Sequence, residues 1–149
     1  MTNLRYKLFL LIVLFPAVAF AKIHEVQMLN NVNGQSMVFS PGYLEIGLGD
    51  QVVFISKNKS HNSRSVFVPK GAQPWKGKNN ENITVSFEKE GIYIYDCSNH
   101  YMMAMTGIIK VGKSTNLDEA KEFIKSYKKN FVMNKNRLDD YLKKVNSPL

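Results

Sequence analysis

Residues 97–105 of the chain read CSNHYMMAM, and this short stretch decides how the rest of the sequence is interpreted. It holds the only cysteine of the chain, one of its three histidines and three of its seven methionines. As metal ligands, Cys97, His100 and Met105 offer a thiolate, an imidazole and a thioether. With a second imidazole they would form the ligand set of a blue-copper electron-transfer site. The remaining sequence must therefore supply that histidine and a fold that brings it to Cys97.

The first 21 residues have the features of a secretory signal peptide. Arg5 and Lys7 form a basic start, residues 8–15 are apolar, and residues 19–21 (AFA) form a small-x-small cleavage site. An uncleaved anchor is the alternative, but the apolar run is short for a membrane span and a proline interrupts it. Cleavage after residue 21 leaves residues 22–149, enough for one domain with a hydrophobic core.

Export to the periplasm would change the meaning of Cys97. In an oxidising compartment a lone thiol is reactive, paired with another chain, buried as a structural residue or bound to a metal. Buried structural cysteines are common. The neighbouring histidine and methionines favour the metal-bound alternative.

The charge of the chain gives little information about its partners. The formal net charge is +8, and subtracting Arg5 and Lys7 leaves +6 for the mature chain. This balance gives weak support for an acidic partner. It gives no support for a nucleic acid, because the sequence lacks an arginine-rich run with interleaved aromatic residues.

Short apolar runs separated by turn residues fill residues 22–112 and predict an all-β, two-sheet sandwich. Residues 92–95 are apolar on both alternating faces, as expected for a strand that is covered on both sides. The predicted strands are residues 24–29, 37–39, 43–46, 51–55, 66–68, 83–87, 92–95 and 105–111.

Residues 113–149 change to a helical period and predict two C-terminal helices packed on the sandwich. Asn116 and Glu119 have the spacing of a capping box at the first helix. Because acidic residues are mixed among the lysines, solvated amphipathic helices are favoured over a membrane-binding tail. The apolar positions are Leu117, Ala120, Phe123, Ile124 and Tyr127 in the first helix, and Leu138, Tyr141, Leu142 and Val145 in the second, which ends at Ser147 and Pro148.

The second imidazole is expected from His61, in a polar loop just after a core strand. His24 lies at the mature N-terminus, where fraying is common, and receives no role. The pattern is then a distant histidine followed by Cys-x2-His-x4-Met on one loop between two strands. Each residue alone is weak evidence, but together in an exported β-domain they indicate a metal site.

At these residues the sequence resembles the cupredoxins and, within them, the pseudoazurins. Plastocyanin shares the Cys-x2-His-x4-Met spacing but lacks the two C-terminal helices, and amicyanin has a shorter His-to-Met gap. The resemblance is carried by residues 97–105 (CSNHYMMAM), 59–62 (KSHN), 26–30 (VQMLN), 36–41 (SMVFSP), 49–54 (GDQVVF) and 91–93 (GIY).

The resemblance implies a Greek-key β-sandwich that binds one copper ion through His61, Cys97, His100 and Met105. It implies a monomeric, non-enzymatic carrier that alternates between Cu(I) and Cu(II) and meets its redox partners transiently. A copper nitrite reductase or a c-type cytochrome is the expected kind of partner. Asn62 matches an asparagine that fixes the ligand loops and hydrogen-bonds the cysteine sulfur.

Two residues of this loop region depart from the family pattern. Asn99 stands where a proline usually precedes the loop histidine, so one restraint on His100 is lost. Asp96 stands where lysine often precedes the cysteine, which predicts a negative charge near the site and puts the basic docking ring in doubt. Met102 and Met103 compete with Met105 as axial ligand, and the family spacing favours Met105.

His100 is expected to reach the surface through an apolar patch where a partner docks. The expected members of the patch are Met37, Tyr101, Met102 and Met105, and the orienting lysines are Lys59, Lys57, Lys76 and Lys78. A copper-delivery protein using the same ligands is a second hypothesis. A third, an enzyme with Cys97 as nucleophile and a histidine as base, is disfavoured because the methionines would have no use.

Overall fold

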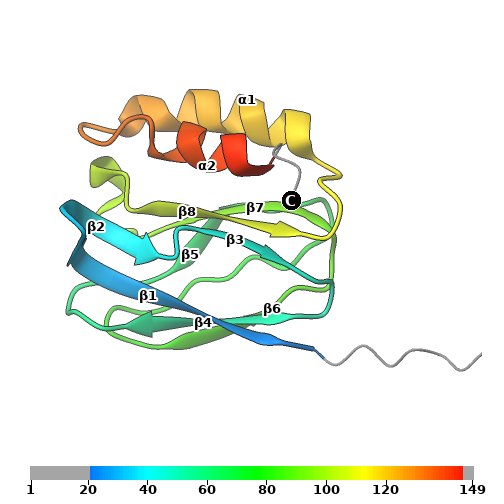
Figure 1. Cartoon of the computed structure of the whole chain (residues 1–149), viewed down its shortest axis with the longest axis horizontal. Coiled ribbons are helices and arrows are strands. Elements are labelled where there is room, and N and C mark those ends of the chain that lie inside the picture. The colour runs from blue at the N-terminus through cyan, green and yellow to red at the C-terminus, as the bar shows by residue number, and fades with distance from the viewer. Residues whose placement is uncertain (1–20, 146–149) are drawn as a thin grey trace, which may run out of the picture.

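The computed structural model describes residues 21–145, and its strands form two four-stranded sheets packed face to face (Figure 1). One sheet has the order β2-β1-β4-β6 and the other the order β3-β8-β7-β5. The pairs β1–β4 and β3–β8 are parallel, and the other pairs are antiparallel. The strands are β1 (Ile23–Val32), β2 (Gln35–Ser40), β3 (Tyr43–Ile46), β4 (Gln51–Ser56), β5 (Arg64–Phe67), β6 (Ile83–Ser86), β7 (Gly91–Asp96) and β8 (Thr106–Val111).

Strand β7 is covered on both faces, as the sequence predicts. Tyr93 and Tyr95 point into the core between the two sheets, and Cys97 continues this face just beyond the strand. Ile92 and Ile94 point the other way, into a second core beneath the helices. The alternation of side chains along β7 therefore places the thiol of Cys97 between the two sheets and the side chain of Asp96 on the face that the helices cover.

Two helices, α1 (Leu117–Tyr127) and α2 (Arg137–Val145), cover the outer face of the β3-β8-β7-β5 sheet (Figure 1). The 3-10 turn η2 (Lys128–Asn130) follows α1. The predicted packing is thus confirmed. The predicted capping box is wrong, because the side chain of Asn116 does not cap α1. It instead accepts from Ile92 N at 2.7 Å and donates to Ile92 O at 3.1 Å, which attaches the start of α1 to the sheet.

Several predicted strands extend further than the apolar runs that indicated them. Strand β1 reaches Val32 and β5 begins at Arg64, because main-chain pairing continues through polar residues. No helix within residues 21–145 is long and apolar enough to cross a membrane. The predicted signal peptide and the predicted helix end at Ser147 and Pro148 lie outside the described residues, apart from Ala21.

Candidate metal centre

The ligand loop between β7 and β8 closes on itself through main-chain hydrogen bonds. Cys97 N donates to Met105 O at 3.0 Å, so the two ends of the loop are paired across its base. His100 N donates to Cys97 O at 3.0 Å, and Met105 N donates to His100 O at 3.2 Å. The turn η1 (Tyr101–Met103) lies between His100 and Met105. These bonds give the loop a defined shape.

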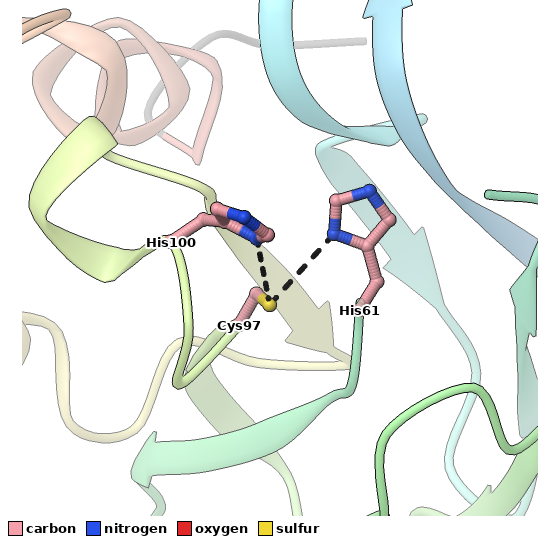
Figure 2. A group of neighbouring side chains, drawn as sticks. All are labelled: His61, Cys97 and His100. Carbon is pink, nitrogen blue, oxygen red and sulfur yellow. Dashed lines mark hydrogen bonds between the residues drawn. The ribbon is translucent and has the colours of Figure 1, made fainter. Parts of the chain in front are cut away.

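The sandwich brings His61, Cys97 and His100 together, as Figure 2 shows. His61 comes from the connection between β4 and β5, and both it and Cys97 are fully buried. The sulfur of Cys97 lies 3.5 Å from Nδ1 of His100 and 3.9 Å from Nδ1 of His61. Nitrogen and sulfur ligands at about 2.0 and 2.3 Å from a single ion stand roughly 3.5 Å apart at near-tetrahedral angles. The arrangement therefore fits a single metal ion.

Asn30 of β1 holds the ring of His61 in the orientation that metal binding requires. Nε2 of His61 lies 2.8 Å from Oδ1 of Asn30. Because an amide oxygen only accepts hydrogen bonds, Nε2 carries the proton and the lone pair of Nδ1 is left facing the thiol. Burial lowers the pKa of His61, and the charge of His100 lowers it further. The neutral, ligating form of His61 is thereby favoured.

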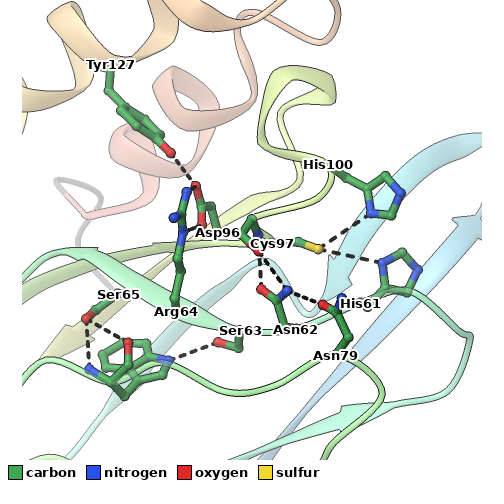
Figure 3. Close-up of polar contacts among 12 residues, drawn as sticks. His61, Asn62, Ser63, Arg64, Ser65, Asn79, Asp96, Cys97, His100 and Tyr127 are labelled. Carbon is green, nitrogen blue, oxygen red and sulfur yellow. Dashed lines mark hydrogen bonds and ion pairs between the residues drawn. The ribbon is translucent and has the colours of Figure 1, made fainter.

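Asn62 joins the two ligand loops, but not in the way the family resemblance implies. Its Oδ1 accepts from Ser98 N at 3.0 Å, and its Nδ2 donates to Ser98 Oγ at 2.8 Å and to Asn79 Oδ1 at 2.5 Å (Figure 3). Both amide hydrogens are thus used. Within the described residues Asn62 fixes the loops through Ser98, and the expected bond to the Cys97 sulfur is not formed.

Asn99 supplies a restraint of its own where the family pattern has proline. Its Nδ2 donates to Ser60 O at 2.9 Å and to Asn79 Oδ1 at 3.0 Å. Ser60 directly precedes His61, so this side chain connects the loop of His100 to the loop of His61. Hydrogen bonds across the two loops thus stand where the family pattern has the fixed ring of proline.

Asp96 places its carboxylate beside the site, as predicted, but inside the protein and not at its surface, so it gives no ground to doubt a basic docking ring. Its side chain is fully buried on the helix side of β7, opposite to Cys97. Arg64 binds it with two bonds, Nε to Oδ1 at 2.7 Å and a terminal nitrogen to Oδ2 at 3.2 Å, and Tyr127 of α1 donates to Oδ2 (Figure 3). The hydrogen bond to Asp96 raises the pKa of Arg64, and burial raises that of Tyr127. The carboxylate is therefore neutralised inside the protein.

Of the residues predicted to form an apolar surface patch around His100, all but one are at least partly exposed. Met105 is fully buried in the same core cluster as Cys97, so it cannot contribute to a surface. Met102 is 46% exposed, and His100, Tyr101 and Met37 are half-buried. The lysines that were expected to orient a partner, Lys57, Lys59, Lys76 and Lys78, are all exposed.

The donor set matches copper by its chemistry. Thiolate favours Cu(I), imidazole also binds copper, and a thioether in the fourth position completes a blue-copper site. Met105 lies where such a thioether is needed along the chain, paired through its backbone with Cys97 and His100. Sequence reasoning missed Asn30 and Asn79, because nothing in their local sequence indicates contact with residues so distant along the chain.

Comparisons with known proteins agree with this geometry. Residues 26–112 match the family of copper binding proteins described as plastocyanin/azurin. The pseudoazurin of Paracoccus pantotrophus is 38% identical over 108 residues, which are 70% of this chain and 74% of the relative. The pseudoazurin structure from Hyphomicrobium denitrificans is 39% identical with a TM-score of 0.76, covering 84% of this chain and 99% of its own.

A second solved pseudoazurin, from Sinorhizobium meliloti, is 36% identical with a TM-score of 0.74, and it covers 85% of this chain and 98% of its own. The two sheets, the two C-terminal helices and the His-Cys-His group, in which His61 and Cys97 are buried, are thus accompanied by similarity over most of the described residues. The chain therefore belongs to the plastocyanin/azurin family of copper-binding proteins, the cupredoxins, and within that family to the pseudoazurins.

Proposed function

We propose that this copper electron-transfer protein is a periplasmic carrier that moves single electrons through one type 1 site. The ion would be held by His61, Cys97, His100 and the thioether of Met105. Residues 1–21 are its signal peptide, and residues 22–149 form one domain with a sandwich (22–112) and a helical extension (113–149). It acts as a monomer and not as an enzyme.

The observation that carries the proposal is the shell of hydrogen bonds around the three ligand residues, in which His61 and Cys97 are buried and His100 is half-buried. His61 is held by Asn30, the ligand loop is closed between Cys97 and Met105, and Asn62 joins the two loops. When bound, the copper ion supplies the one-electron redox couple. The protein keeps the ligand positions constant and excludes water on the side of His61 and Cys97. Electron transfer is fast when both oxidation states use the same geometry, and this shell provides that condition.

The partner surface is proposed to surround His100, the half-exposed ligand. Met102 supplies exposed apolar area beside it, and the exposed lysines supply positive charge that suits an acidic patch on a redox protein. Because Asp96 is paired with Arg64, its carboxylate does not oppose this field. A copper nitrite reductase or a c-type cytochrome with an acidic face is the proposed partner class.

The direct test is to add Cu(II) to the purified mature protein and to record its visible spectrum. An intense thiolate-to-copper band is expected, and Cys97→Ser should abolish it. Met105→Leu should change the band and the reduction potential, whereas Met102→Leu, the matched control on the exposed side, should leave both unchanged. A colourless protein that binds copper weakly would contradict the site.

Electron self-exchange separates a carrier from a copper-delivery protein, which would use the same ligands. A carrier should exchange electrons rapidly between its oxidised and reduced forms and keep its copper in the presence of a Cu(I) chelator. Slow exchange together with ready transfer of Cu(I) to an acceptor protein would favour delivery.

A further inference from the structure

The carboxylate of Asp50, just before β4, is held by three donors, two of which belong to residues at the beginning of β1. Its Oδ1 accepts from the backbone N of Lys22 at 2.8 Å. Its Oδ2 accepts from Gly47 N at 3.0 Å and lies 2.8 Å from Nε2 of His24. Asp50 is only 7% exposed, so its charge is largely removed from water.

A nearly buried carboxylate is stable when a positive charge offsets it. The N–H groups of Lys22 and Gly47 are dipoles, and His24 supplies a full charge only when both ring nitrogens carry protons. Lys22 is also fixed from its other side, because Gln51 N donates to Lys22 O at 2.8 Å. The backbone nitrogen of residue 22 is therefore held directly against a nearly buried carboxylate.

We propose that proteolytic cleavage between Ala21 and Lys22 completes this site, and that Asp50 is the receptor for the new α-ammonium group of Lys22. Water adds across the peptide bond, the C–N bond breaks, Ala21 leaves with a carboxylate and Lys22 retains a protonated amine. No electron is transferred. The existing hydrogen bond becomes an ion pair without movement of the chain.

Two independent observations meet at this bond. The small-x-small pattern at residues 19–21 places cleavage after Ala21 from the sequence alone. The contact between Lys22 N and Asp50 places a receptor for a positive charge at the next nitrogen. Only the occurrence of cleavage rests on the proposed export, and the ion pair itself can be tested on any chain that begins at Lys22.

The ion pair would anchor the strand that carries Asn30 to the sandwich. Ile23 pairs with Gln51 directly beside the receptor, and β1 continues along β4 up to the pair Met28–Ser56. Asn30, two residues further, holds the ring of His61. Maturation would thus secure the end of a strand whose other end orients a copper ligand.

The experiment uses the full chain, exported from cells. The mass of the purified protein is expected to correspond to a chain that begins at Lys22. The matched variant has one glycine inserted between Ala21 and Lys22, and mass spectrometry is used to select the exported product that begins with this glycine. In that product the ammonium group lies one residue, about 3.8 Å along the chain, away from its native position beside Asp50. The melting temperature of the inserted form should be lower by roughly 3 °C or more.

The control is the same comparison in Asp50→Asn, between the chain that begins at Lys22 and the chain that begins with the inserted glycine. There the insertion should have no effect on melting, because the receptor charge is gone. The proposal would be overturned if the inserted glycine left the melting temperature of the protein with Asp50 unchanged. It would also be overturned if the glycine lowered the melting temperature equally with Asp50 and with Asp50→Asn. An exported protein that begins at another residue would overturn it as well.

A direct titration of the α-amine by NMR gives a second readout that does not depend on stability. An ordinary α-amine has a pKa of about 7.7 to 8.0. Pairing with Asp50 should raise the pKa of the Lys22 α-amine by about one unit, and Asp50→Asn should return it to the ordinary range. An unshifted amine in the native protein would overturn the pairing. The copper spectrum of the same samples tests the proposed electron-transfer site separately, so the two proposals can fail independently.

Discussion

The guanidinium of Arg137, at the start of α2, donates to the carbonyl oxygen of Ala104 in the ligand loop at 2.6 Å. The same nitrogen donates to Met37 O at 2.7 Å, and the other terminal nitrogen donates to Ser36 O at 3.1 Å. Arg137 is 7% exposed, and Ala104 has a left-handed φ of 57° just before Met105. One buried cation of the helical extension therefore holds two segments at the proposed copper site.

Replacing Arg137 should disturb the site as well as the stability. Arg137→Lys retains the charge but cannot reach three carbonyls with a planar fork, and Arg137→Gln also removes the charge. Because buried carbonyl groups would lose their hydrogen bonds, the free energy of unfolding should fall by about 2–3 kcal/mol in Arg137→Gln and by less in Arg137→Lys, as measured by denaturant unfolding. The reduction potential should change in both variants. Lys135→Gln, an exposed neighbour, is the control, and an unchanged potential in Arg137→Gln would contradict the connection to the site.

The Arg64–Asp96 pair should behave as a buried ion pair rather than as a docking feature. Asp96→Asn leaves Arg64 and Tyr127 without the carboxylate, so the free energy of unfolding should fall by about 3 kcal/mol. The loss is no larger because the Arg64 side chain retains some exposure to water. The exchanged pair, Arg64→Glu with Asp96→Lys, should recover part of that stability. If Asp96→Asn instead changed the salt dependence of partner binding at unchanged stability, the carboxylate would belong to the docking surface.

Asn99 should act as a restraint on the ligand loops. Asn99→Ala removes the hydrogen bonds to Ser60 and Asn79. The free energy of unfolding should therefore fall by about 1–2 kcal/mol, and copper should be released faster to a chelator. Gln73→Ala, at an exposed position outside the loops, is the control. Equal copper release from Asn99→Ala and the native protein would show that the main-chain bonds of the loop are sufficient.

Asp50 should make the stability of the protein depend on pH. The hydrogen bond from Lys22 N, followed by that from His24, lowers the pKa of Asp50. Its stabilisation is therefore fully present above the unfolded-state pKa of about 3.9 and is lost as the pH falls through the lower folded-state pKa. The difference in unfolding free energy between the native protein and Asp50→Asn should be largest near neutral pH, should begin to decrease below about pH 4 and should vanish below the folded-state pKa. A difference that stays constant down to pH 2 would mean that the charge of Asp50 is not responsible.

The ligand loop shows how much of the site could be predicted from local sequence. Cys97 and His100 are three residues apart, so one tight turn brings both side chains to the same point whatever the rest of the fold does. His61 could be proposed because strand alternation and the loop after β4 place it at one end of the sandwich. The two-faced pattern of residues 92–95 likewise predicted a strand that separates two cores, and the helices cover it as expected.

The amino-acid sequence by itself determined the candidate ligands, the two-sheet class and the two amphipathic helices, because these depend on residue chemistry and short periodicities. Tertiary structure alone decided the partners of the remaining polar groups. Arg64 meets Asp96 from 32 residues away, Asn30 meets His61 from 31, and Arg137 meets Met37 from 100. A buried charge takes whichever partner the packing of sheets and helices brings within reach. For that reason the negative charge of Asp96, predicted near the site, is held here in an internal ion pair with Arg64.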